Sequence, residues 1–168
     1  MIFVTVGTNE APFDRLLAAV DELQLDERLV VQCGASSIRP ARAECSEFLS
    51  FSELGARVRE ARVVVTHAGV GSVAVALANG KQPVVVPRLA AFREAVDDHQ
   101  QLFARRFAAN GQVRLVEDPA LLAAALLETD EVRVAPARAA TGALAVELRG
   151  YIEGLLRPDL GLTATRPR

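Results

Sequence analysis

A histidine, two glycines and a serine lie within six residues, His67 to Ser72, directly after an apolar run. Gly69 and Gly71 remove side chains where the chain turns from a predicted strand into a predicted helix. The free backbone N–H groups and the positive end of that helix then face outward and suit a phosphate. Ser72 adds a hydroxyl donor, and His67 adds an imidazole that can donate to a phosphate oxygen. The spacing predicts a diphosphate site, although a tight turn capped by Ser72 would use the same residues.

Two further segments place polar groups after predicted strands. Gly7 and Thr8 follow the first strand, where the glycine allows close approach of the backbone. The second segment holds Asp97, Asp98, His99 and Gln100 in the first turns of a later helix. Gln100 offers a donor and an acceptor, which suits neighbouring sugar hydroxyls, whereas the two aspartates also fit an ordinary acidic helix start.

A dinucleotide site is an alternative interpretation of the same glycines. Residues 69–74 satisfy the pattern G-x-G-x-x-A. That fingerprint requires an acidic residue after the following strand, where this sequence has Pro87 and Arg88. An arginine there could bind a 2′-phosphate, so an NADP-binding Rossmann domain stays open as a second alternative.

The elements that must position these residues alternate along the chain. Strands are predicted at residues 2–6, 29–33, 47–51, 63–66, 83–87 and 113–116. Helices are predicted at residues 12–23, 54–61, 70–78 and 94–109, from residue 119, and over residues 144–155. The predicted inward side chains of the fourth helix are Val96, Leu102, Phe103 and Phe107. Because the strands are continuously apolar, we expect a doubly wound, mostly parallel α/β sheet with helices on both faces.

Composition limits the class of protein. The 168 residues are 51% hydrophobic and 24% charged with a net charge of −2, which suits one globular domain and not a nucleic-acid-binding protein. The longest apolar run, residues 120–127, is shorter than the roughly 18 residues of a membrane span. Cys33 and Cys45 are expected to be reduced thiols that are buried or half-buried. We expect a domain over residues 1–156, a flexible tail over 157–168, no secretory signal and a cytoplasmic protein.

Taken together, these motifs resemble a known family. Residues 66–72, 80–88 and 97–100 resemble the glycosyltransferase family 28 C-terminal domain, the Rossmann-like donor half of GT-B transferases. Residues 4–8 and 13–16 are similar to the small catalytic subunit of the dolichol-linked GlcNAc transferase. The whole combination, over residues 1–115, looks most like bacterial exopolysaccharide glycosyltransferase subunits of the PssE type.

The resemblance implies roles for individual residues. Val75 stands where the family often has an acid for the ribose, so no ribose contact is implied. His99 is a candidate catalytic base only for an acceptor that approaches closely. Phe51 is a candidate for the uracil pocket or for the core. The implied donor contacts are the diphosphate residues His67, Gly69, Gly71, Ser72, Gly7 and Thr8, and the sugar residues His99 and Gln100.

The resemblance also implies a reaction. It is the transfer of a sugar, such as glucuronic acid or a hexose, from a UDP-sugar to a lipid-linked acceptor in polysaccharide biosynthesis. The UDP-sugar is a substrate, and neither a cofactor nor a metal is expected. A GT-B hexosyltransferase needs two domains, so a membrane-associated partner is expected to bind the acceptor, supply the base and recruit this chain to the inner face of the plasma membrane. A non-catalytic regulatory subunit that binds a UDP-sugar is the other alternative.

Overall fold

The computed structural model describes residues 1–129. The predicted helix over 144–155, the boundary at residue 156 and the tail over 157–168 lie outside them. The strands are β1 (Ile2–Thr5), β2 (Leu29–Gln32), β3 (Ala43–Ser46), β4 (Val63–His67), β5 (Val84–Val86) and β6 (Arg114–Leu115). The helices are α1 (Asp14–Asp21), α2 (Phe51–Glu60), α3 (Val70–Ala78), α4 (His99–Ala109) and α5 (Leu122–Leu127), with short 3-10 turns at Ala90–Phe92 and Pro119–Leu121. Within residues 1–129, no helix is long and apolar enough to span a membrane.

The six strands form one parallel sheet in the order β3-β2-β1-β4-β5-β6. Phe3 of β1 pairs with Val30 of β2 on one side and with Val64 of β4 on the other. The strand order therefore reverses between β1 and β4. In open sheets of this kind, ligands bind beyond the carboxyl ends of the strands at that reversal.

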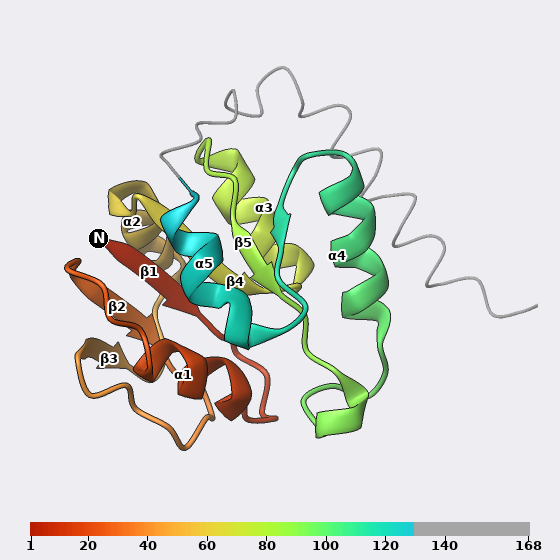
Figure 1. Ribbon diagram of the computed structural model, residues 1–168, viewed down its shortest axis with the longest axis horizontal. Helices are drawn as coiled ribbons and strands as arrows, with labels where there is room; N and C mark the ends of the chain where they lie inside the picture. The colour runs from red at the N-terminus through yellow and green to blue at the C-terminus, as the bar shows by residue number, and fades with distance from the viewer. Residues whose placement is uncertain (130–168) are drawn as a thin grey trace, which may run out of the picture. The chain divides into compact units, whose positions relative to one another are not determined.

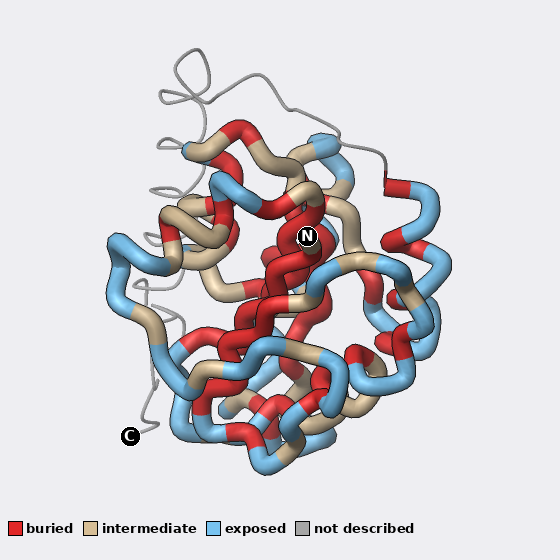
Figure 2. The backbone as a smooth tube through the Cα atoms, turned by 90° about the vertical axis from the view of Figure 1, so that its left-hand side faces the viewer, coloured by how far each residue is buried: buried red, intermediate tan, exposed pale blue. Residues whose placement is uncertain are grey.

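Helices cover both faces of the sheet, as the apolar strands predicted (Figure 1). One core joins α1 and α5 to side chains such as Val4 and Val65. The other core lies against α2 and α3 and contains Phe3 and Val64. Five apolar residues recur at helical spacing within the predicted helix 12–23, and all are buried: Phe13, Leu16, Leu17, Val20 and Leu23. Figure 2 shows buried residues running through the middle of the described part of the chain, with exposed residues toward its outside.

The third strand was predicted one segment too late. Residues 47–51 are not a strand, because Ser50 begins a helix: its hydroxyl accepts from the backbone N–H of Glu53, and the Glu53 carboxylate accepts from the backbone N–H of Ser50. Phe51 is thus the first residue of α2 rather than the end of a strand. The true strand, β3, is an edge strand, and Cys45 on it is exposed although it was expected to be at least half-buried.

Helix α4 starts five residues later than predicted. Arg93 has a left-handed backbone with φ of 58°, and the buried carboxylate of Glu94 accepts a hydrogen bond from the backbone N–H of Leu89. These contacts hold the chain in a loop up to Asp98. Consequently the inward face of the helix holds Phe103, Ala104 and Phe107. The predicted burial of Val96 and Leu102 was wrong, since they are 99% and 67% exposed.

Candidate functional site

A cleft of about 350 Å³ lies at the carboxyl ends of β1, β2 and β4. This volume is in the range of small-molecule sites. Its lining includes Gly7, Thr8, His67, Gly69, Gly71 and Ser72, all of which the sequence assigned to a diphosphate. Its apolar wall holds Leu49, Phe51, Leu54 and Val75, and Thr5 and Gln32 complete the lining. The fold therefore gathers the predicted diphosphate residues, together with Phe51, at the reversal point of the sheet.

The N-terminus of α3 opens into this cleft. Gly69 is the residue before the first helical turn, and no side chain within residues 1–129 caps it. The backbone N–H of Val73 bonds to the carbonyl oxygen of Gly69 at 3.1 Å, so the N–H groups of residues 70–72 lack acceptors within the helix. Ser72 is the third residue of the helix and not its cap. Free N–H groups, a helix dipole and a hydroxyl meet here, and together they suit an anion.

The imidazole of His67 lies between two glycines. A Cβ atom at Gly7 would overlap Cε1 of the ring, and one at Gly69 would overlap Nε2. Gly7 also has a φ of +77°, which favours glycine independently. Both glycines are thus explained by the packing of His67.

Gly71 differs from the other two glycines. A Cβ atom there would have no neighbouring atom within 4 Å, although the residue lines the cleft. Gly71 is consequently the glycine whose missing side chain leaves space for a ligand.

His67 is neutral at physiological pH. Burial lowers its pKa to about 4, the positive charge of Arg88 acts in the same direction, and a hydrogen bond to the backbone of Thr5 opposes both. A neutral imidazole has a single N–H group. With that group bonded to the Thr5 carbonyl, donation to a phosphate requires a proton on the second nitrogen, which a nearby diphosphate charge favours.

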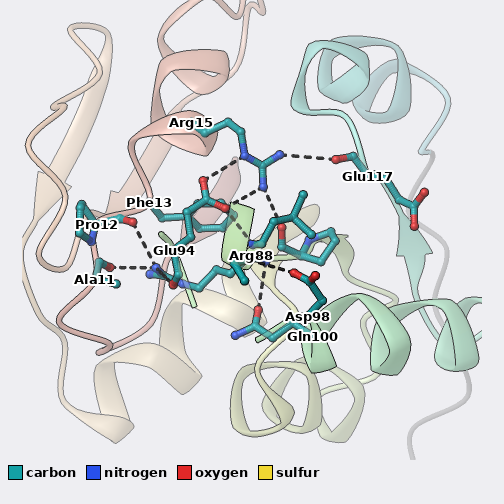
Figure 3. A network of polar contacts seen from close by, with 12 residues as sticks. Ala11, Pro12, Phe13, Arg15, Arg88, Glu94, Asp98, Gln100 and Glu117 are labelled. Carbon is teal, nitrogen blue, oxygen red and sulfur yellow. Dashed lines mark hydrogen bonds and ion pairs between the residues drawn. The ribbon is translucent and has the colours of Figure 1, made fainter. Parts of the chain in front are cut away.

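Arg88 joins the loop that follows β1 to the loop that follows β5 (Figure 3). Its side chain is completely buried and lies 4.7 Å over the ring of Phe13. Arg15 and Glu94 form an ion pair of 2.9 Å beside it. The Arg88 guanidinium donates to the carbonyl oxygens of Val6, Ala11, Pro12 and Glu94. Buried in this way, Arg88 cannot reach a 2′-phosphate, and the NADP alternative loses the residue that supported it.

His99 and Gln100 lie outside the cleft lining, at the start of α4 beyond the end of β5. The side-chain oxygen of Gln100 accepts from the backbone N–H of Arg88 at 3.2 Å, so its NH₂ group is the part left to donate. The His99 ring contacts Asp97, and the backbone N–H of His99 lowers the pKa of that carboxyl. Their assignment to the donor sugar stays a prediction.

Four lining residues had no predicted role: Thr5, Gln32, Leu49 and Leu54. Thr5 and Gln32 carried a signal, because each is a polar residue at the carboxyl end of an apolar strand. Within residues 1–129, histidine, cysteine, aspartate and glutamate side chains form no group of three that could hold a metal ion.

Comparison with known proteins places the chain among glycosyltransferases. The profile of the glycosyltransferase family 28 C-terminal domain matches residues 1–152. The chain is 32% identical over 115 residues to the UDP-N-acetylglucosamine--N-acetylmuramyl-(pentapeptide) pyrophosphoryl-undecaprenol N-acetylglucosamine transferase of Chromohalobacter salexigens. That match covers 68% of this chain and 30% of that protein, so the chain spans under a third of the relative.

Solved structures show the same fold. MurG of Acinetobacter baumannii has a TM-score of 0.54 at 18% identity, over 89% of this chain and 49% of that one. The glycosyltransferase SnogD from Streptomyces nogalater has a TM-score of 0.55 at 20% identity, over 90% of this chain and 39% of that one. The predicted Rossmann-like fold of GT-B glycosyltransferases is confirmed. The finer likeness to PssE-type and dolichol-linked subunits stays a prediction.

Proposed function

The chain belongs to the glycosyltransferase family 28 C-terminal domain family, and we propose that it is the donor-binding half of a transferase that takes its sugar from a UDP-sugar. The observation that carries the proposal is the uncapped N-terminus of α3, which opens with Ser72 and His67 into a cleft with an apolar wall.

The two kinds of lining residue in the cleft suit the two parts of a nucleoside diphosphate, the charged diphosphate and the flat base. The N–H groups of residues 70–72 and the Ser72 hydroxyl would hold the diphosphate and stabilise the negative charge that develops on departing UDP. No proton transfer is needed for this stabilisation. Leu49, Phe51 and Leu54 provide an apolar surface for a base.

We propose that a second subunit completes the enzyme. The relative from Chromohalobacter salexigens is named for transfer to a pyrophosphoryl-undecaprenol acceptor, and this chain corresponds to 30% of it. A membrane-associated partner would bind a lipid-linked acceptor, supply the general base and bring this chain to the inner face of the plasma membrane. The product would be a polysaccharide precursor, with glucuronic acid or a hexose as the transferred sugar.

Nucleotide binding tests the donor site. In isothermal titration calorimetry, the chain should bind UDP and bind NADPH at least tenfold more weakly. Ser72→Ala should weaken UDP binding about tenfold or more, because a hydrogen bond to a charged group is lost. Ser52→Ala is the control, since Ser52 is exposed on α2 outside the cleft lining. Absence of UDP binding, or tighter binding of NADPH, would contradict the proposal.

A further inference from the structure

Two buried polar residues end neighbouring strands at the floor of the cleft. Thr5 closes β1 and Gln32 closes β2, and the two are paired in the parallel register. Thr5 is 2% exposed and Gln32 is 3% exposed, yet both line the cleft. Buried polar groups are normally hydrogen-bonded, so their partners indicate what remains available to a ligand.

The hydrogen bonds fix the orientation of the Gln32 amide. The backbone N–H of Gly7 donates to the Thr5 hydroxyl oxygen at 3.2 Å, which leaves the hydroxyl hydrogen to donate onward. It donates to Oε1 of Gln32 at 2.5 Å. That separation fits an O–H···O bond and is too short for an ordinary N–H···O bond. Accordingly, the amide oxygen faces Thr5 and the NH₂ group is left facing the cleft.

The Gln32 NH₂ group has no hydrogen-bond partner among residues 1–129. Its nitrogen is not among the fully buried side-chain atoms that lack a hydrogen-bond partner. A donor of this kind, fixed in orientation on a residue that lines the cleft, fits an acceptor atom on a ligand.

The position of Gln32 selects which part of a nucleotide it meets. Strand β1 lies between β2 and β4, so the end of β2 is about 10 Å, two strand spacings, from the end of the strand that leads into α3. The apolar wall of Leu49 and Leu54 shares this cleft. A flat base on that wall would present its polar edge to the sheet floor, whereas the diphosphate would lie at the N-terminus of α3.

We propose that Gln32 selects the base of the donor nucleotide by donating from Nε2 to the O4 carbonyl of uracil, with Thr5 as the positioning residue. The inference rests on the proposed function. Cytosine carries an amino group where uracil carries O4. Two donors would then face each other, and the buried Gln32 NH₂ would have no acceptor.

Calorimetry with UDP, CDP and inorganic pyrophosphate tests the proposal on the full chain. Wild type should bind UDP about tenfold tighter than CDP. Gln32→Met keeps the side-chain length and removes the donor, so the UDP-to-CDP ratio should fall to about one while pyrophosphate affinity is unchanged. Gln24→Met, at an exposed glutamine that bonds Arg42, is the matched control and should keep the wild-type ratio.

Thr5 variants test the positioning role. Thr5→Val removes the hydroxyl that holds Oε1, so the amide can turn and the UDP-to-CDP ratio should drop. Thr5→Ser restores the hydroxyl and should restore the ratio. This pair also decides the matter if Gln32→Met does not fold, as judged by circular dichroism.

The inference would be overturned by a wild-type UDP-to-CDP ratio near one, by a Gln32→Met ratio equal to that of wild type, or by equal losses of affinity for UDP and pyrophosphate. A variant that instead loses the preference for UDP over 2′-deoxy-UDP would assign Gln32 to the ribose and equally overturn it. Failure of wild type to bind UDP at all contradicts the proposed function, whereas UDP binding without base preference contradicts only this inference.

Discussion

Gly71 is glycine for a different reason from Gly7 and Gly69, and the difference can be tested by substitution. A methyl group there meets no protein atom and would occupy ligand space. Gly71→Ala should leave the free energy of unfolding unchanged or raise it by up to about 1 kcal/mol, because alanine is the better helix former. UDP affinity, measured by calorimetry, should fall about tenfold or more.

Gly55→Ala is the matched control for this substitution. Gly55 is also helical, and a Cβ atom there would lie 3.4 Å from Nη1 of Arg59, an ordinary contact. It should keep wild-type UDP affinity. Equal UDP affinities for the two variants would show that no ligand lies over Gly71.

His67 should make stability depend on pH. Its pKa is about 4 in the folded state, below the usual 6.5, so the unfolded state binds more protons between these values. Stability should therefore fall as the pH falls through this window, by roughly 2 kcal/mol between pH 7 and pH 5. Urea unfolding of wild type and His67→Gln should show a smaller loss in the variant. Identical slopes in the two proteins would contradict the assignment.

At the residue scale, the sequence predicted the site residues that act through local backbone geometry better than those whose role depends on contacts between distant residues. The role of the run from His67 to Ser72 could be predicted because its glycines and serine act through local backbone geometry. The packing reason for Gly7 could not be predicted from the sequence, since it depends on the His67 imidazole, 60 positions away. Gln32 was missed for the same reason: its meaning depends on the register between β1 and β2, which no local pattern encodes.

At the scale of elements, the segment from Arg88 to Asp98 is held by one buried cation. Arg88→Met should lower the free energy of unfolding by about 3–5 kcal/mol, because four carbonyl oxygens lose their donor in a buried site. Urea unfolding measures this loss. Arg105→Met is the control: Arg105 lies on the exposed face of α4 and pairs with Glu117 at the surface, so its replacement should cost far less stability. Equal losses would refute a structural role for Arg88.

The starts of α2 and α4 show why the boundaries of elements were harder to predict than the elements themselves. The start of α2 had a local signal, Ser50 followed by Glu53, that outweighs the strand-like side chains before it. The start of α4 had none, because the buried Glu94 before it is fixed by an ion pair with Arg15, which is distant in the sequence, and its carbonyl oxygen accepts from Arg88.

At the scale of the whole molecule, we expect donor binding to need this chain alone and sugar transfer to need a partner as well. The chain alone should bind UDP and transfer no sugar, while co-expression with an acceptor-binding partner, sought first in the neighbouring gene, should give transfer to a lipid-linked acceptor. Radiolabelled sugar in the lipid fraction is the measurement. Transfer by the purified chain would refute the two-subunit arrangement.

Ser72→Ala in the assembled complex distinguishes a catalytic from a regulatory subunit. Loss of transfer with the complex intact, judged by co-purification, supports a catalytic donor site. Unchanged transfer would support the regulatory alternative, in which this chain binds the UDP-sugar without taking part in the reaction.

The packing of His67 between Gly7 and Gly69 restricts how this site can change in evolution. A larger residue at Gly69 becomes sterically acceptable only after the imidazole is lost, because the two would occupy the same space. The order of substitutions is therefore constrained, with position 67 changing first. Gly7 is not released in the same way, since its φ of +77° would still penalise a side chain. Lineages without the histidine should then vary at position 69 while keeping glycine at position 7.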